Sequence, residues 1–131
     1  TNMPNWCTNE IEVDFDTKEN FNAFKEFALT EIDGNTILDF SKIIPPPEKF
    51  AGDNPADGWY EWRNANWGTK WSLNEMSYDE YINGDGASMC FDTAWSPPEG
   101  IYEALVTKFE DMSINWFYRE DGCQLVGWLP S

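Results

Sequence analysis

Residues 6–15 carry the most restrictive pattern in the chain, a strict alternation between two kinds of side chain. One set is mainly apolar and comprises Cys7, Asn9, Ile11, Val13 and Phe15. The other set is mainly polar and comprises Trp6, Thr8, Glu10, Glu12 and Asp14. Because successive side chains of a β-strand point to opposite faces, this pattern predicts a strand with one face in the core and an acidic face outside.

The remaining periodic stretches predict two helices and four more strands. Asp16-Thr17-Lys18-Glu19 and Ser96-Pro97-Pro98-Glu99 are both typical of a helix start with a capping-box glutamate. Apolar residues recur at helical spacing after each start, so the helices should run to about residues 30 and 109. We expect strands at 36–44, 88–93, 113–119 and 124–128, with turns at Asp33-Gly34 and Asp121-Gly122.

This order of elements is typical of an α+β ferredoxin-like fold, a split β-α-β topology with an antiparallel sheet and two helices on one face. The first strand is central in that topology, so its acidic face should lie on the open side of the sheet. We expect one domain over residues 1–131. A long tryptophan-rich insertion at about 45–87 should separate the second and third strands, with a short helix near 59–64 and a helical turn at 77–81.

Charge and composition exclude several classes of function. The chain has 24 acidic and 8 basic residues and a net charge of −16. Phosphate binding requires clustered Lys and Arg, so we expect no direct contact with nucleic acid and instead a basic protein or nucleoprotein partner. The sequence contains no histidine, which excludes a Ser-His-Asp triad and a His-based metal site, so we expect no enzyme activity, cofactor or metal.

Cysteine usage and hydropathy predict a location in the cytoplasm. The three cysteines are far apart in the sequence, which favours reduced thiols. The chain contains no apolar run of about 20 residues and no secretory signal pattern, so we expect no contact with a membrane.

Residues 59–71 hold four of the eight tryptophans, together with Arg63 and Lys70. Rings of this size are expected either to pack on a sheet or to line a binding site. In the first hypothesis the segment clamps the insertion to the sheet, with an ion pair between Lys70 and Asp92. In the second it lines a small-molecule or peptide pocket formed by Trp62, Arg63, Trp67, Lys70, Trp71, Asp92 and Trp95.

Three motifs are spread over nearly the whole chain: MPNWCTN at residues 3–9, WYEWRNANWGTKW at 59–71 and FDTAWSPP at 91–98. In this order they resemble the YubB-type family of small proteins carried by bacteriophages and plasmids. The resemblance implies a ferredoxin-like fold and an origin in a mobile genetic element. It implies no activity and no catalytic residue.

We therefore expect a non-enzymatic phage or mobile-element protein that inhibits a host defence complex, such as a CRISPR effector or a restriction enzyme, by mimicking nucleic acid. Alternate residues of a strand lie about 6.6 Å apart, close to the roughly 7 Å between successive phosphates of a nucleic-acid strand. The acidic partner-binding surface comprises Glu10, Glu12, Asp14, Asp57, Glu61, Asp79 and Glu80. An ordinary solvated sheet face alternates in the same way, so the tryptophan pocket stays as the alternative.

Overall fold

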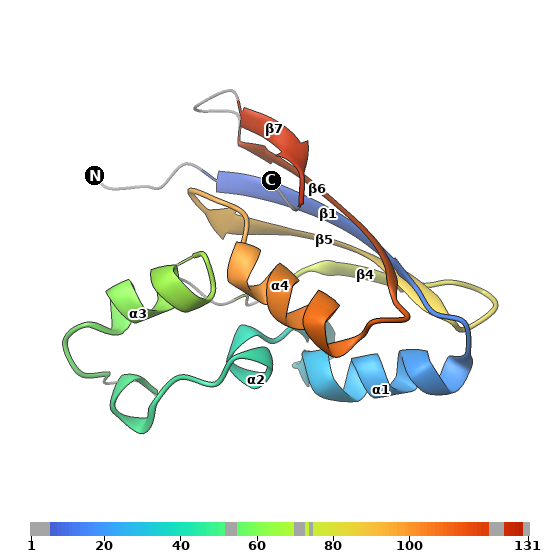
Figure 1. The fold of residues 1–131 in the computed structure, drawn as a ribbon, viewed down its shortest axis with the longest axis horizontal. Helices are drawn as coiled ribbons and strands as arrows, with labels where there is room; N and C mark the ends of the chain where they lie inside the picture. The colour runs from blue at the N-terminus through green and yellow to red at the C-terminus, as the bar shows by residue number, and fades with distance from the viewer. Residues whose placement is uncertain (1–5, 52–54, 70–72, 74, 121–124, 130–131) are drawn as a thin grey trace.

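Figure 1 shows the computed structural model, which describes residues 6–51, 55–69, 73, 75–120 and 125–129. The elements in chain order are β1 (Trp6–Asp14), α1 (Lys18–Ala28), β2 (Leu29–Ile32), β3 (Asn35–Leu38), α2 (Phe40–Ile43), the 3₁₀ helix η1 (Glu48–Phe50), α3 (Trp59–Asn66), β4 (Ser77–Glu80), β5 (Gly86–Ala94), α4 (Glu99–Lys108), β6 (Ser113–Glu120) and β7 (Leu125–Trp128).

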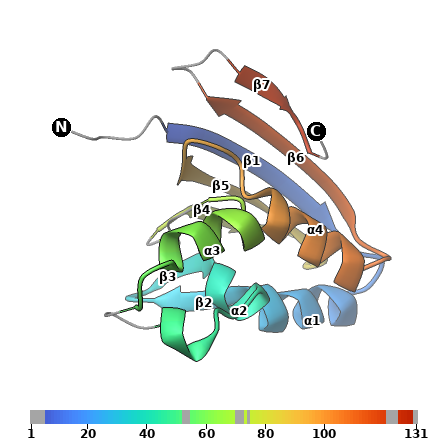
Figure 2. The same cartoon turned by 60° about the vertical axis from the view of Figure 1, so that its left-hand side comes forward.

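The main sheet has five antiparallel strands in the order β4-β5-β1-β6-β7, so the prediction that the first strand is central is confirmed. The hairpin β2-β3 forms a separate two-stranded sheet. Figures 1 and 2 show all four α-helices gathered on one side of the main sheet. We call that side of the sheet the covered face and the other side the open face.

The core lies between the covered face and the helices, and β1 supplies one row of it. Its predicted inner residues are all buried, and the predicted acidic residues of the other set are exposed. Phe15 follows β1 and packs against Phe24 of α1 and Phe109 after α4, with ring centroids 5.5 and 5.9 Å apart. The alternation in the sequence therefore predicted both faces of β1 correctly, because one face meets the helices and the other meets water.

Asn9 is a polar residue on the covered face, and it is fully buried. Its Nδ2 donates hydrogen bonds to Thr93 Oγ1 at 3.0 Å and to the Cys7 carbonyl at 3.2 Å. Its Oδ1 accepts one from Trp116 Nε1 at 2.9 Å. Because buried polar groups need partners, Asn9 stabilises the three central strands by linking β1 to β5 and β6.

Helix α1 begins one residue later than the capping pattern suggests. Its N-cap is Thr17, whose hydroxyl accepts a hydrogen bond from the Asn20 backbone N–H at 3.1 Å. The helix ends at Ala28, and β2 follows it directly, where the sequence predicted no strand. The predicted turn at Asp33-Gly34 is present and joins β2 to β3, with φ values of 51° and 83°.

The predicted strand at 36–44 is wrong after Leu38. Asp39 caps a short helix, α2, and its side chain accepts from the Lys42 backbone N–H at 3.3 Å. Phe40 and Ile43, which are three residues apart, are the buried residues of this helix. A capping aspartate followed by this spacing is a helix signal that outweighs the β-branched residues before it.

The predicted helical turn at 77–81 is also wrong, because Ser77–Glu80 is the edge strand β4 paired with β5. Such short polar segments take their conformation from the partner strand more than from their own propensity. Helix α4 starts at Glu99 without a side-chain cap, and the Ser96 hydroxyl instead donates to the Gly68 carbonyl at 2.7 Å. The short helix predicted near 59–64 is present as α3.

In the part of the chain that the structure describes, no helix is long and apolar enough to span a membrane.

Candidate functional site on the open sheet face

The first row across the open face includes one residue from every strand of the main sheet. The register aligns Ser77, Cys90, Glu10, Phe117 and Trp128. Directly paired residues of an antiparallel sheet point to the same side, so these five side chains share the open face. Glu10 is exposed at the centre of the row, between Cys90 and Phe117.

The neighbouring row is polar and acidic. It aligns Asp79, Ser88, Glu12 and Asn115, and both carboxylate residues are exposed. The two rows together line a shallow hollow of about 580 Å³. This hollow places Asp79 of β4 with Glu10 and Glu12 of β1, so three of the predicted acidic residues meet at one place.

Two more acidic residues belong to the open face. Asp14 ends β1 beyond Glu12, and Asp92 pairs with Thr8, whose hydroxyl donates to Asp92 Oδ1 at 3.1 Å. The register also places Arg119 beside Thr8 on this face. The described part of the open face therefore carries five carboxylates and one guanidinium.

The pKa values of neighbouring groups respond to this negative charge. Burial raises the pKa of the Cys90 thiol, and Glu10 and Asp92 raise it further, while Arg119 lowers it. The pKa of Tyr81 is raised first by burial and then by Glu12 and Asp14. Each acidic side chain disfavours a second negative charge nearby, as expected for a surface of one sign.

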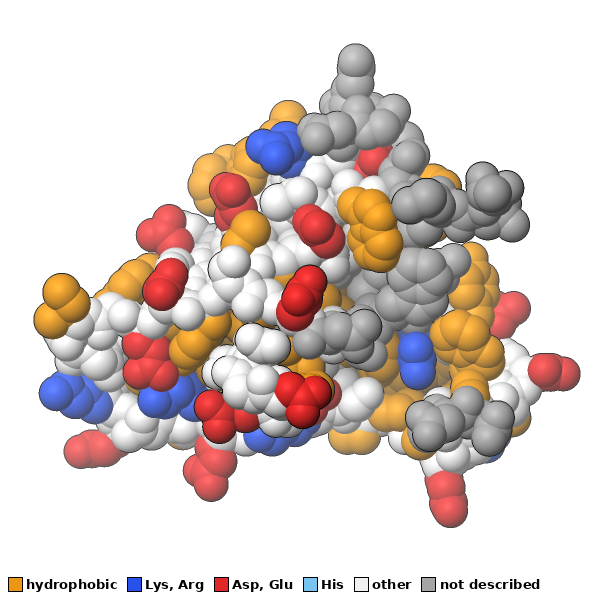
Figure 3. All heavy atoms as spheres, turned by 180° about the vertical axis from the view of Figure 1, so that it is seen from behind, with side chains coloured by type: hydrophobic (Ala, Val, Ile, Leu, Met, Phe, Trp, Pro, Cys, Tyr) orange, Lys and Arg blue, Asp and Glu red, His pale blue; other side chains and the backbone are white. Residues whose placement is uncertain are grey.

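An aromatic edge borders the carboxylates, and the sequence analysis did not identify it. Trp128 of β7 keeps 60% of its surface exposed, and its ring meets Phe117 at 5.1 Å between centroids. Val126 and Trp6 are also exposed. Figure 3, which shows the side away from the viewer of Figure 1, shows acidic side chains set among hydrophobic ones. The alternation of Val126 and Trp128 was the available signal, but a short C-terminal strand gave no reason to prefer either face.

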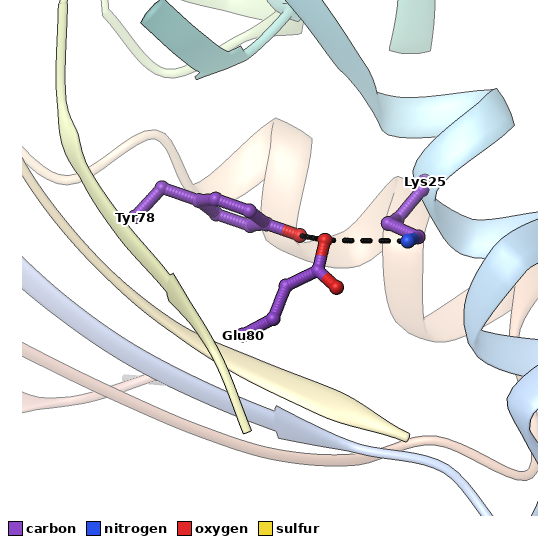
Figure 4. A network of polar contacts seen from close by, with 3 residues as sticks. All are labelled: Lys25, Tyr78 and Glu80. Carbon is purple, nitrogen blue, oxygen red and sulfur yellow. Dashed lines mark hydrogen bonds and ion pairs between the residues drawn. The ribbon is translucent and has the colours of Figure 1, made fainter. Parts of the chain in front are cut away.

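Glu80 lies apart from the other acidic residues because it points to the covered side of β4. Figure 4 shows its carboxylate between α1 and β4, where it accepts from Lys25 Nζ at 3.2 Å and from the Tyr78 hydroxyl at 2.9 Å. Burial raises the pKa of Tyr78, and the hydrogen bond to Glu80 raises it further. Asp57 and Glu61 are exposed at α3, in the helical layer, so the structure does not bring them to the open face either.

The described part of the tryptophan segment packs into the protein. Trp67 is fully buried, and its Nε1 donates to the Ile44 carbonyl at 3.0 Å. Its ring contacts Trp62 and Phe40 edge-on, at 5.8 and 5.7 Å between centroids. The Arg63 guanidinium lies over the Trp67 ring at 5.0 Å, and burial lowers its pKa.

Hydrogen bonds connect this segment to β5 and α4. The Thr69 hydroxyl is buried and donates to the Ala94 carbonyl at 3.1 Å, and the Gly100 N–H donates to the Trp67 carbonyl at 3.1 Å. A Cβ on Gly68, which has φ of +90°, would lie 2.6 Å from the Glu99 nitrogen. These contacts support the clamp hypothesis.

The residues predicted to line a pocket do not all come together. Lys70 and Trp71 lie outside the described residues, so the predicted pair with Asp92 stays a prediction. Asp92 is on the open face and borders a second cavity of about 700 Å³, together with Trp6. Trp95 is exposed after β5 and has an unusual φ of 70°.

Cys7 and Cys90 are free thiols, and Cys123 lies outside the described residues. Burial raises the pKa of Cys7 to about 11. Within the described ranges, no group of three or more Cys, Asp and Glu side chains is arranged to hold a metal ion.

Comparison with known proteins supports the fold. Residues 66–129 match a family described as "Ferredoxin-like domain in Api92-like protein". This match covers β4 to β7 together with α4, so the chain contains a ferredoxin-like domain with an α+β, antiparallel architecture. Neither a curated protein nor a solved structure shows significant similarity to the chain.

Proposed function

We propose that this is a non-enzymatic protein of a bacteriophage or other mobile element, of YubB type, that binds and inhibits a host nucleic-acid-binding defence complex through the open face. The observation that carries the proposal is the row of exposed carboxylates at Glu10, Glu12 and Asp14 on the central strand. Their spacing of about 6.6 Å approximates that of phosphates, and the sheet presents them on a rigid frame. The mobile-element origin rests on the resemblance of the three sequence motifs.

The placement of Asp79 and Asp92 supports this function. Both residues join the three carboxylates of β1 on the same face, although they are distant in sequence. A surface of one sign attracts a basic partner over a distance of about one Debye length and is weakened by salt. We propose cytoplasmic action on such a partner, without direct contact with nucleic acid.

We further infer that the main sheet is a split β-α-β unit made of β1, α1, β4, β5, α4 and β6. The observed order β4-β5-β1-β6 supports this topology, because α1 follows β1 and α4 connects β5 to β6. The insertion then comprises residues 29–76, between the first helix and the second strand of the unit, and not residues 45–87 between the second and third strands as the sequence predicted. β7 is an added edge strand.

The test uses two variants that remove the same number of carboxylates from different places. The first carries Glu10→Gln, Glu12→Gln and Asp14→Asn on the open face. The control carries Glu26→Gln, Glu103→Gln and Glu110→Gln, three exposed residues outside the main sheet. Wild type and both variants are immobilised, exposed to bacterial host lysate and eluted with increasing salt.

Wild type and control should retain a basic nucleic-acid-binding complex that is released by moderate salt, and the open-face variant should lose it. The captured complex should then bind DNA less well in the presence of the wild-type protein. Equal capture by the two variants would show that the position of the carboxylates does not matter, and this result would reject the proposal.

The alternative function is an accessory protein with a small-molecule or peptide pocket. Of the residues predicted for this pocket, Asp92 borders the cavity of about 700 Å³ together with Trp6, but no described residue of the 59–71 segment lines that cavity. The burial of Trp67 also leaves that ring little access to a ligand. If the alternative holds, substitution of Trp62 should abolish binding without unfolding the domain. Loss of folding on that substitution would favour the clamp.

A further inference from the structure

We propose that the open face recognises an arginine side chain of its protein partner. The guanidinium would occupy the hollow between the carboxylates of Glu10 and Glu12 and the indole of Trp128. This inference rests on the proposed function, because it specifies which chemical group of a basic partner the open face selects.

The lining of the hollow combines two features that suit a guanidinium. Glu10, Glu12 and Asp79 contribute carboxylates, and Phe117 and Trp128 contribute aromatic rings. A carboxylate accepts paired N–H groups from the planar guanidinium, and the face of an indole attracts a cation. Lysine can pair with the carboxylates only as a point charge, and it lacks the planar group that stacks on a ring.

The strand register sets the distance between the two features. Glu10, Phe117 and Trp128 occupy one row on three neighbouring strands. Strands lie about 4.8 Å apart, so Glu10 and Trp128 are separated by about 10 Å at the backbone, with Phe117 between them. Phe117 lines the hollow between them, so a planar cation at this place would meet a carboxylate on one side and an indole on the other.

Charge complementarity selects a cationic occupant. Trp128 is 60% exposed, although burial of such a ring is favourable, and it borders carboxylates. These carboxylates repel an acidic partner, and a purely apolar partner would remove their water without replacing its hydrogen bonds. Arg119 stands in the next row and does not line the hollow. A group that binds here must therefore pack against the indole and also pair with the carboxylates. The arginine side chain does both.

The test measures fluorescence anisotropy of three labelled octapeptides made of arginine, lysine or citrulline. Citrulline keeps the shape of arginine without its charge, and lysine keeps the charge without the planar group. Wild type should bind the arginine peptide about 3- to 10-fold more tightly than the lysine peptide and should not bind the citrulline peptide. Trp128→Leu should remove the preference for arginine over lysine while leaving salt-dependent binding of both.

A double variant, Glu10→Gln with Glu12→Gln, should weaken both basic peptides at least 10-fold, and Glu103→Gln with Glu110→Gln should change binding less than 2-fold. Circular dichroism confirms that each variant is folded. Equal affinity for arginine and lysine in wild type, or a preference that survives Trp128→Leu, would overturn this inference alone. If neither basic peptide binds, or if the Glu10 and Glu12 double variant binds normally, the acidic face does not bind basic partners. The proposed function is then rejected together with this inference.

Discussion

On the covered face of the sheet, Trp116 is fully buried, and its Nε1 donates to Asn9. On the open face, on the neighbouring strand, Trp128 is mostly exposed beside carboxylates. Both rings come from C-terminal strands of the same sheet, so the residue type alone does not separate a core ring from a surface ring. The comparison shows that the packing on each face of the sheet decides whether a tryptophan is a core residue or a surface residue. The densest tryptophan cluster in the sequence therefore need not be the binding surface.

The sharpest contrast in stability should come from Trp67→Ala and Trp128→Ala. Loss of the fully buried Trp67 ring leaves a cavity and an unpaired Ile44 carbonyl, so the free energy of unfolding should fall by about 3–5 kcal/mol. Loss of the exposed Trp128 ring should lower it by less than about 1 kcal/mol. Urea unfolding measures both values, and similar losses would remove the distinction between the two faces.

A second contrast tests the clamp with two glycines of similar backbone conformation. Gly68 has φ of +90°, and a Cβ there would lie 2.6 Å from the Glu99 nitrogen. Gly34 has φ of +83° and no atom within 4 Å of such a Cβ. Gly34→Ala should therefore lower the free energy of unfolding by about 1 kcal/mol, because alanine disfavours the left-handed conformation. Gly68→Ala should lower it by about 2–3 kcal/mol, because the backbone must also move. Equal shifts in thermal unfolding would show that the clamp is not tightly packed.

The third contrast is the pH dependence of stability for thiols on the two faces. The pKa of Cys7 rises from 9.0 to about 11 because the thiol is buried. The unfolded thiol ionises first, so this stabilisation is complete below about pH 9 and is lost as pH rises towards 11, by up to roughly 2–3 kcal/mol. Cys7→Ala should flatten the decline in unfolding free energy over that range.

Cys90→Ala is the matched control on the open face. Cys90 is only partly buried, so its substitution should change the alkaline decline less than Cys7→Ala. An equal or larger effect at Cys90 would contradict the difference in burial between the two thiols. Urea titrations at several pH values between 8 and 11 give the slopes.

Part of the fold could be predicted from local sequence because its determinants are local. The period of two in β1 identified its buried and exposed sides, and the Asp33-Gly34 turn followed from backbone preference. The strand expected at 36–44 failed because the capping role of Asp39 was not recognised. The strand β4 was missed because a short polar segment becomes a strand only beside its partner.

The part of the candidate site that lies on a single strand could be predicted from the sequence. Glu10, Glu12 and Asp14 share a face through the geometry of one strand, so sequence was sufficient to group them. Consecutive residues of β4 point to opposite faces of the sheet, so Asp79 lies on the open face with these carboxylates and Glu80 lies on the covered face. The sequence did not predict this strand. Trp128 entered the site through the pairing of β7 with β6, which brings it beside Phe117.

The sequence by itself determined the acidic character of the chain, the two-sided nature of β1 and its place at the centre of a ferredoxin-like sheet. The tertiary structure decided which tryptophans are buried and which carboxylates meet in one hollow. Periodicity is a property of neighbouring residues and can be read along the chain. Burial and charge proximity depend on strands and helices that are distant in sequence, so they become defined only when the sheet pairs and the helices cover one of its faces.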